Sequence, residues 1–350
     1  MKLKMISLHS IYNPGSSWQT YGLQKFLMQS GFSIEIIDYR PYYSTIGKNK
    51  LKGILRKILF FRNERKLKDK YESFINEYMQ LTAKRYNSYS DLQNSNLDAD
   101  VFISGSDQLW NMDYDCGNDE SYYLTFTDGR KISYATSVGK NPISQRELDE
   151  ITGRISTFDM ISVREKSTSE ILAKVLKRKV NWVCDPVFLL SADEYKKVIK
   201  KPLSEEYAII YLSEESALLN DIVKNLKETL CCKIVLLGGN RVRCKCDVHI
   251  KDLGPLDFIS YIENAEMVIS SSFHATAFSH IFHKKFGVIL PKKNGERMLS
   301  LLSLSNLTDR IIACDEDIIK IYSEIDYAEV DKKLEGFVSY SKKVLLNALH

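Results

Sequence analysis

Short apolar runs of strand-forming residues alternate with helical patterns along almost the whole chain, and this alternation restricts the fold more than any other feature. The runs with the length and composition of strands span residues 4–9, 33–39, 101–104, 131–138, 160–164 and 181–185, and then 207–212, 233–237, 248–251, 267–271 and 285–290. Several are continuously apolar, as expected for parallel strands that helices cover on both faces. The pattern predicts an α/β fold with parallel sheets.

A polar, charged stretch at residues 191–206 divides the alternation into two blocks. A chain of 350 residues is longer than one compact core usually holds, so its length also favours two domains. We predict doubly wound, Rossmann-like domains at residues 1–195 and 205–330, and a last helix at 331–350 that can cross back to the first domain. Ligands of doubly wound sheets bind outside the carboxyl ends of the strands, so the two domains are expected to face a cleft.

The composition excludes several classes of protein. With 44% hydrophobic and 27% charged residues the chain is globular, and a net charge of +4 is too small to indicate a nucleic-acid partner. The absence of a long apolar run and of a signal peptide, together with seven cysteines, predicts a cytoplasmic protein with reduced thiols. No P-loop, GxGxxG, HExxH or GxSxG motif occurs. Cys244, Cys246 and His249 form only a weak metal pattern, so we expect no metal site.

One segment differs from the rest, a basic helical insertion at about residues 47–85. Its first part, Gly47–Lys70, holds ten Lys or Arg, and apolar residues recur there at helical spacing. A basic amphipathic helix can lie on an anionic membrane, which would make the protein peripheral to the inner membrane face. The alternative, which we favour, is a helix that covers a domain and exposes its charged face to solvent.

The richest candidate site follows the strand at residues 267–271. Three serines lead into a helix that carries a histidine in its first turn: Ser270, Ser271, Ser272 and His274. Backbone N–H groups at a helix start, together with serine hydroxyls, can hold a phosphate or carboxylate, and the histidine can bind the same anion or move a proton. An equal alternative is that a serine caps the helix and His274 packs beneath it.

Two further strand ends present polar side chains. Arg164 ends the strand at 160–164, where its guanidinium suits bidentate contact with a phosphate or carboxylate; a salt bridge between the domains is the alternative. After the strand at residues 101–104 comes a set of short polar side chains that suits sugar hydroxyls: Ser106, Asp107, Gln108 and Asn111. Asp107 can accept a hydroxyl proton, although a Ser-Asp pair at a strand end can also simply cap a helix.

Together these segments resemble the polysaccharide pyruvyl transferase family. The resemblance covers most of the chain, in the family's order, and is carried by NPGSSWQTYGLQKFL, GFSIEIIDYRP, FISGSDQLWN, KISYATSVGK, ISVREKSTSEIL, CDPVFLL, PLDFISYIENAEMVISSSFHATAFSHIF and RMLSLLSLSNLTDR. It implies a fold like that of the GT-B glycosyltransferases. It also implies transfer of pyruvate from phosphoenolpyruvate onto two hydroxyls of a sugar or lipid-linked oligosaccharide, giving a cyclic ketal and phosphate during synthesis of a cell-surface polysaccharide such as a capsule or exopolysaccharide.

The resemblance also assigns roles to residues. The family's SVR arginine falls on Arg164 and its helix-start histidine on His274, and both are expected to contact phosphoenolpyruvate. Some members have an arginine two residues before that histidine, where this chain has Ser272, and Arg297 in the RMLSLL segment is our candidate replacement. The N-terminal loop departs from the family's pattern just before Gln19, where the acceptor sugar is expected to lie.

In this scheme a proton must reach the enol methylene carbon, His274 is either the acid that supplies it or a contact to the phosphate, and Asp107 is the base for the attacking hydroxyl. Phosphoenolpyruvate is the donor substrate, and no metal or other cofactor is required. Two other functions stay open. A glycosyltransferase that uses a nucleotide sugar would have the same architecture, because a fold does not fix a function. A non-catalytic sugar-binding relative would have lost one anion contact, at Ser272.

Overall fold

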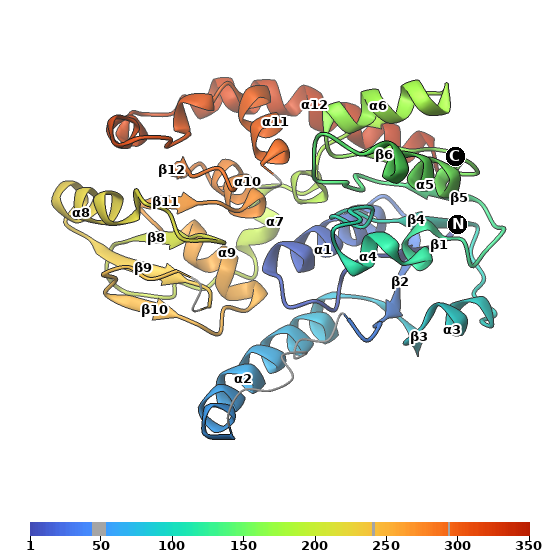
Figure 1. Ribbon diagram of the computed structural model, residues 1–350, viewed down its shortest axis with the longest axis horizontal. Helices are drawn as coiled ribbons and strands as arrows, with labels where there is room; N and C mark the ends of the chain where they lie inside the picture. Colours follow the sequence, from blue (N-terminus) through green and yellow to red (C-terminus); the bar gives the residue numbers. More distant parts are fainter. Residues whose placement is uncertain (44–53, 240–241, 293–294) are drawn as a thin grey trace. The chain divides into compact units, whose positions relative to one another are not determined.

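The computed structural model describes residues 1–43, 54–239, 242–292 and 295–350, which form two compact units. Unit 1 comprises Met1–Leu51, Glu72–Leu190 and Glu335–His350, and unit 2 comprises Lys52–Tyr71 and Ser191–Leu334. The domains expected from the sequence placed the whole insertion at 47–85 and the residues up to 195 in the first domain, whereas Lys52–Tyr71 and the residues from Ser191 belong to unit 2. Each unit contains one parallel sheet covered by helices (Figure 1).

The sheet of unit 1 has the strand order β3-β2-β1-β4-β5, with every pair parallel. Its strands are β1 (Lys2–Ile6), β2 (Ser33–Tyr39), β3 (Leu81–Tyr86), β4 (Val101–Ser104) and β5 (Lys131–Ser133), and β6 (Ser162–Val163) pairs with β7 (Asn181–Trp182). Isolated bridges from Ile132 to Met160 and from Thr136 to Val163 join this pair to β5. The chain reverses its direction of travel across the sheet between β1 and β4, which marks the point where ligands of such sheets bind.

The helices of unit 1 are α1 (Pro14–Gln29), α3 (Tyr89–Gln93), α4 (Asp115–Asn118), α5 (Gln145–Ile155) and α6 (Lys166–Leu176), with short 3-10 turns η1 (Glu120–Tyr123) and η2 (Pro186–Leu189). α1 begins earlier than the sequence suggested. The Asn13 side chain accepts hydrogen bonds from the next turn and Pro14 occupies the first helical position, so the expected N-terminal loop is the first two turns of the helix. α2 (Ile54–Tyr78) and α12 (Tyr327–Asn347) contribute residues to both units.

One local expectation for unit 1 was wrong. β3 was included in a helical insertion, because its sequence LTAKRY is polar; it is an edge strand with Ala83, Lys84 and Arg85 exposed.

Unit 2 repeats the topology, with the strand order β10-β9-β8-β11-β12. Its strands are β8 (Tyr207–Tyr211), β9 (Lys233–Leu237), β10 (Val248–Ile250), β11 (Met267–Ser270) and β12 (Lys285–Val288), within two residues of the expected runs. Its helices are α7 (Ala192–Lys196), α8 (Leu219–Leu230), α9 (Pro255–Glu263), α10 (Phe273–Ile281) and α11 (Glu296–Ser305), with 3-10 turns η3 (Thr308–Arg310) and η4 (Asp315–Tyr322). The direction of travel reverses between β8 and β11.

Alternate residues of the β8 strand explain why both faces of this sheet are apolar. Ala208 and Ile210 pack in the core formed with α8 and η4, whereas Ile209 between them is equally buried on the opposite side. α9 and α10 contact each other (Figure 1). The continuous apolar runs in the sequence therefore reflect burial on two faces.

The basic segment Gly47–Lys70 lies partly outside the described residues, which exclude 44–53 and the side chains of 54–63. Its far end packs on unit 2. Lys70 Nζ lies 2.8 Å from Asp257 Oδ2 and donates to the Asp252 carbonyl at 2.7 Å, and the adjacent Tyr71 is buried. Among the described residues no helix is long and apolar enough to cross a membrane.

Candidate functional site

The polar cluster of unit 2 lies where β8 and β11 end, at the reversal point of the sheet. Ser270 Oγ donates to the Tyr211 carbonyl at 2.9 Å and accepts the Ser272 N–H at 2.9 Å. Ser271 Oγ accepts the Ser213 N–H at 2.8 Å. These bonds fix the short connection between β11 and α10 and align the start of α10 with the end of the sheet.

Ser272 caps α10, as the structural alternative proposed. Its side chain accepts from the Ala275 N–H at 3.4 Å, and its carbonyl accepts both the Thr276 N–H and the Thr276 hydroxyl. A cap and a ligand site are compatible here, because one side chain satisfies only one of the N–H groups at a helix start. The positive end of the α10 dipole therefore still favours an anion at this position.

His274 and Arg297 both contact the Phe273 ring. The Phe273 ring centroid is 5.3 Å from the His274 ring and 5.7 Å from the Arg297 guanidinium carbon. His274 is only 6% exposed. Arg297 lies in the first turn of α11, which contacts α10, so the structure brings the proposed replacement cation to the same helix start as the histidine.

The polar cluster of unit 1 lies at the corresponding reversal point, after β1 and β4, and extends to the end of β6. Arg164, Asp107 and Asp185 form a buried ion cluster. Arg164 Nη1 donates to Asp185 Oδ2, and its Nη2 is 3.6 Å from Asp107 Oδ1. Burial lowers the pKa of Arg164, but Asp185, Asp107 and Glu165 raise it by more, so the guanidinium stays charged.

This arrangement changes the interpretation of Arg164. The sequence suggested direct contact with a donor anion or a salt bridge between domains, whereas the observed ion pair with Asp185 lies within unit 1. Its side chain is 2% exposed. The two residues meet because Arg164 follows β6, Asp185 comes after β7, and these two strands pair with each other. Donor contact by Arg164 stays a prediction.

Asp107 occupies a strained backbone conformation at the centre of this cluster. Its φ is 79°, in the left-handed region that non-glycine residues rarely adopt. The carboxylate is held by the Ser16 hydroxyl and by the Gln108 N–H at 2.9 Å, and residue 107 also bridges to Thr136 beyond β5. Strain of this kind persists where the surroundings fix it, and it concentrates at functional sites.

The other expected acceptor ligands do not face solvent. Gln19, Ser106 and Asn111 have no exposed surface, and Gln108 is partly buried. Gln19 Nε2 donates to Ser7 Oγ at 3.0 Å, Ser106 Oγ donates to the Ala135 carbonyl at 2.9 Å, and Asn111 Nδ2 donates to Gln108 Oε1 at 2.8 Å. These side chains stabilise the loops of unit 1, and their contact with a sugar stays a prediction.

A second buried ion cluster was missed. His9 follows β1 and is fully buried, with Nε2 3.0 Å from Asp38 Oδ1 on β2. Arg40 Nε and Arg85 Nε donate to the same carboxylate at 2.6 and 2.8 Å. Burial raises the pKa of Asp38, but these three partners lower it well below its ordinary value. The available signal was a histidine at the end of a predicted strand.

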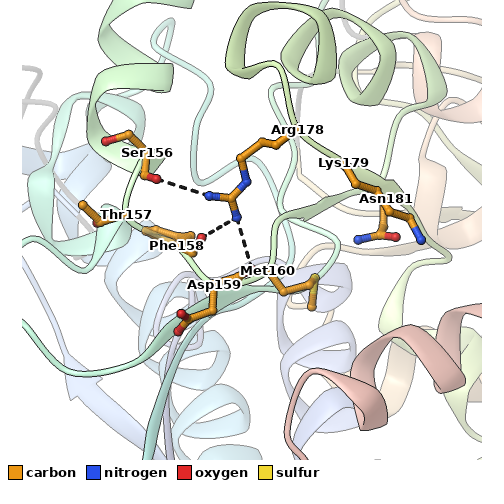
Figure 2. Close-up of a pocket in the computed structure, with 8 residues that line it drawn as sticks. All are labelled: Ser156, Thr157, Phe158, Asp159, Met160, Arg178, Lys179 and Asn181. Atoms are coloured by element: carbon orange, nitrogen blue, oxygen red, sulfur yellow. Dashed lines mark hydrogen bonds between the residues drawn. The ribbon is translucent and has the colours of Figure 1, made fainter.

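A hollow of about 550 Å³ does not belong to this edge of the sheet; the residues that line it are drawn in Figure 2. It lies where β6 and β7 begin, at the amino ends of the strands. Arg178 fills its centre and donates to the carbonyls of Ser156, Phe158 and Asp159, after α5. None of the candidate site residues lines it. Among the described residues no three His, Cys, Asp or Glu side chains are grouped as metal ligands.

The class of protein follows from the two Rossmann-like units and from solved structures with the same fold. A putative UDP-N-acetylglucosamine 2-epimerase from Listeria monocytogenes has a TM-score of 0.52 at 12% identity, over 99% of this chain and 95% of that one. An S. aureus MnaA–UDP structure gives 0.55 at 10% identity, over 99% and 97%. Arabidopsis thaliana UGT89C1 gives 0.53 at 10% identity, over 99% and 98%. The fold is that of the GT-B glycosyltransferases and epimerases.

The family follows from the sequence. The family model for polysaccharide pyruvyl transferase matches residues 13–292, so the chain belongs to the polysaccharide pyruvyl transferase family. The match includes the unit 1 cluster around Asp107 and the α10 start with His274. A search of curated proteins found no match by sequence.

Proposed function

We propose that the protein transfers pyruvate from phosphoenolpyruvate onto two hydroxyls of a sugar in a polysaccharide or its precursor, and that phosphoenolpyruvate binds at the start of α10. The observation that carries the proposal is the meeting of His274 and Arg297 at Phe273, where β11 ends. Phosphoenolpyruvate has a phosphate and a carboxylate. A helix N-terminus suits the first and a guanidinium suits either.

The reaction assigns one proton transfer to His274. Protonation of the methylene carbon makes the adjacent carbon electrophilic, and a first sugar hydroxyl adds there with loss of its proton. A second hydroxyl then displaces phosphate with loss of its own proton, which closes the cyclic ketal. An imidazole can supply the first proton near neutral pH. Asp107 is the proposed base, with its carboxylate oriented by Ser16 and Arg164. The scheme uses no metal.

Calorimetric titration with phosphoenolpyruvate tests the donor site. We expect saturable binding by the wild type and a clear loss of affinity in His274→Ala, with His283→Ala as the control. His283 is half exposed and pairs with Asp331, so its loss leaves the α10 start intact. Uridine diphosphate is titrated in parallel. Tight diphosphate binding without a phosphoenolpyruvate signal would favour a glycosyltransferase, and binding of neither would favour a non-catalytic sugar-binding relative.

We also propose that the enzyme is cytoplasmic and reaches a lipid-linked acceptor through the basic segment Gly47–Lys70. The ten cationic residues of that segment support the proposal, because each cation near an anionic bilayer strengthens its attraction. Co-sedimentation with anionic vesicles is expected, and replacing Lys48, Lys50 and Lys52 with Gln should weaken it. If anionic vesicles retain no wild-type protein, the membrane contact is wrong, whereas the donor site is unaffected.

A further inference from the structure

Unit 1 has a second hollow, at the carboxyl edge of β2 and β3. It measures about 360 Å³ and is lined by the turn after β2, the start of α3 and the segment from α4 to η1. That volume is within the range of small-molecule sites, about 300–1,000 Å³. The edge is the same one at which the Asp107 loop follows β4, because all these strands are parallel (Figure 1).

Tyrosines dominate the wall of this hollow. Tyr42 is 67% exposed, and its ring makes an edge contact with Tyr43 at a centroid distance of 5.5 Å. Tyr43 is held in turn, because its hydroxyl and that of Tyr39 both donate to Asp119 Oδ2. Burial, Tyr122 and Asp119 raise the pKa of Tyr43, so the hydroxyl stays protonated as a donor. The exposed Tyr42 ring therefore packs against a tyrosine that Asp119 holds in place.

The rim of the hollow is polar and acidic. Asp115 and Asn118 on α4 and Asn87 after β3 are exposed there, and no Lys or Arg is among the described residues that line it. A carboxylate and amides offer acceptors and donors for hydroxyl groups, whereas the acidic rim disfavours phosphates and carboxylates. An exposed aromatic ring beside such groups matches a neutral pyranose, which has an apolar C–H face and a rim of hydroxyls.

The wall of the hollow is packed rigidly on the Asp107 loop. Cys116 Sγ on α4 donates to the Gln108 carbonyl at 3.3 Å. A Cβ at Gly117 would lie 2.1 Å from the Asn111 carbonyl oxygen, so the two segments touch with no room for a side chain. The loop with the proposed base and the hollow are therefore parts of one packed surface of unit 1.

We propose that this hollow binds one pyranose ring of the acceptor saccharide, with Tyr42 stacked on its C–H face. The inference deepens the proposed pyruvyl transfer and rests on it for the identity of the sugar as the acceptor. It replaces the buried Gln19, Ser106 and Asn111 as the place where the saccharide contacts unit 1.

Saturation-transfer difference NMR tests the site directly, using the full chain with methyl glycosides of glucose, galactose and mannose at ~10 mM. We expect transfer to the ring C–H protons of at least one hexoside. Tyr42→Ala should weaken that binding about tenfold, whereas Tyr42→Phe, which keeps the ring, should bind like the wild type. The matched control is Tyr340→Ala, which removes another exposed tyrosine of unit 1, far along the chain on α12.

Two results would overturn the proposal: no transfer to any of the hexosides, or equal transfer in the wild type and Tyr42→Ala. Uridine is included as a probe, and if it binds at Tyr42 in place of the hexosides the hollow is a nucleoside site. Phosphoenolpyruvate titration of the same variants separates the two proposals. Tyr42→Ala should bind phosphoenolpyruvate normally. If the wild type binds hexosides but not phosphoenolpyruvate, the sugar site is supported and phosphoenolpyruvate as the donor is contradicted.

Discussion

The two units have the same sheet topology, but their reversal points hold different chemistry. In unit 1, Arg164 pairs with both Asp107 and Asp185 in a buried cluster. In unit 2, the serines bond to backbone groups and to Ser213, and both His274 and Arg297 contact the Phe273 ring. One reversal point has its charges paired inside the fold, whereas the other joins a helix start, an imidazole and a guanidinium.

This difference teaches that an ionic motif at the carboxyl end of a strand can serve either the fold or a ligand. Buried charges are tolerated when they are paired, and a paired arginine has less to offer an incoming anion. Mutation of the paired Arg164 in unit 1 is therefore expected to act mainly on stability, and mutation of His274 in unit 2 mainly on activity. The following predictions test that division.

The largest effect is expected at His274. His274→Gln should lower phosphate release from phosphoenolpyruvate, in the presence of an acceptor hexoside, by about a hundred- to ten-thousand-fold. The urea midpoint should change little, because Gln is also polar and of similar size. His283→Gln, just after the end of α10, should leave the rate unchanged. An active His274→Gln enzyme would remove the histidine from the proton transfer.

The next effect is expected at Arg164. Arg164→Ala should lower the free energy of unfolding by about 3–5 kcal/mol, because it leaves Asp185 and Asp107 buried without their cation. Urea denaturation measures this loss. Arg178→Ala, which removes only hydrogen bonds to carbonyls, is the control. Unchanged stability with lost phosphoenolpyruvate affinity would instead make Arg164 a donor contact and erase the contrast between the units.

A smaller effect concerns the pH dependence of stability and His280, which follows His274 on α10. Burial lowers the pKa of His280 to about 4, so the folded protein holds this ring neutral. The unfolded chain binds a proton at this ring more readily than the folded protein does. The free energy of unfolding is therefore highest above pH 6.5 and decreases as the pH falls toward 4. The loss amounts to about 3 kcal/mol. Thermal unfolding between pH 7 and 4 should show a shallower decline in His280→Gln than in the wild type; parallel curves would contradict the assignment.

The smallest effect compares the two caps. Asn13 caps α1 in unit 1 and Ser272 caps α10 in unit 2. Each change to alanine should cost about 1 kcal/mol in the free energy of unfolding. Phosphoenolpyruvate affinity should be unchanged in Asn13→Ala. If Ser272→Ala lowers that affinity more than tenfold, the Ser272 hydroxyl contacts the donor in addition to capping the helix.

Much of the fold could be predicted from local patterns. The strands at 33–39, 101–104 and 233–237 were placed at their observed bounds, because apolar β-branched runs between turn signals are a local property. β3 could not be found, since an edge strand with exposed charges has no apolar run.

The sequence by itself determined the α/β class, two parallel sheets and the position of the candidate residues at the carboxyl ends of strands. Only the tertiary structure decided which of those residues are already paired. Arg164 meets Asp185, 21 positions away, because β6 and β7 lie side by side. Tyr42 and Asp119 approach one hollow because separate strands end at one edge. Pairing and burial depend on contacts between distant segments, and local periodicity does not contain them.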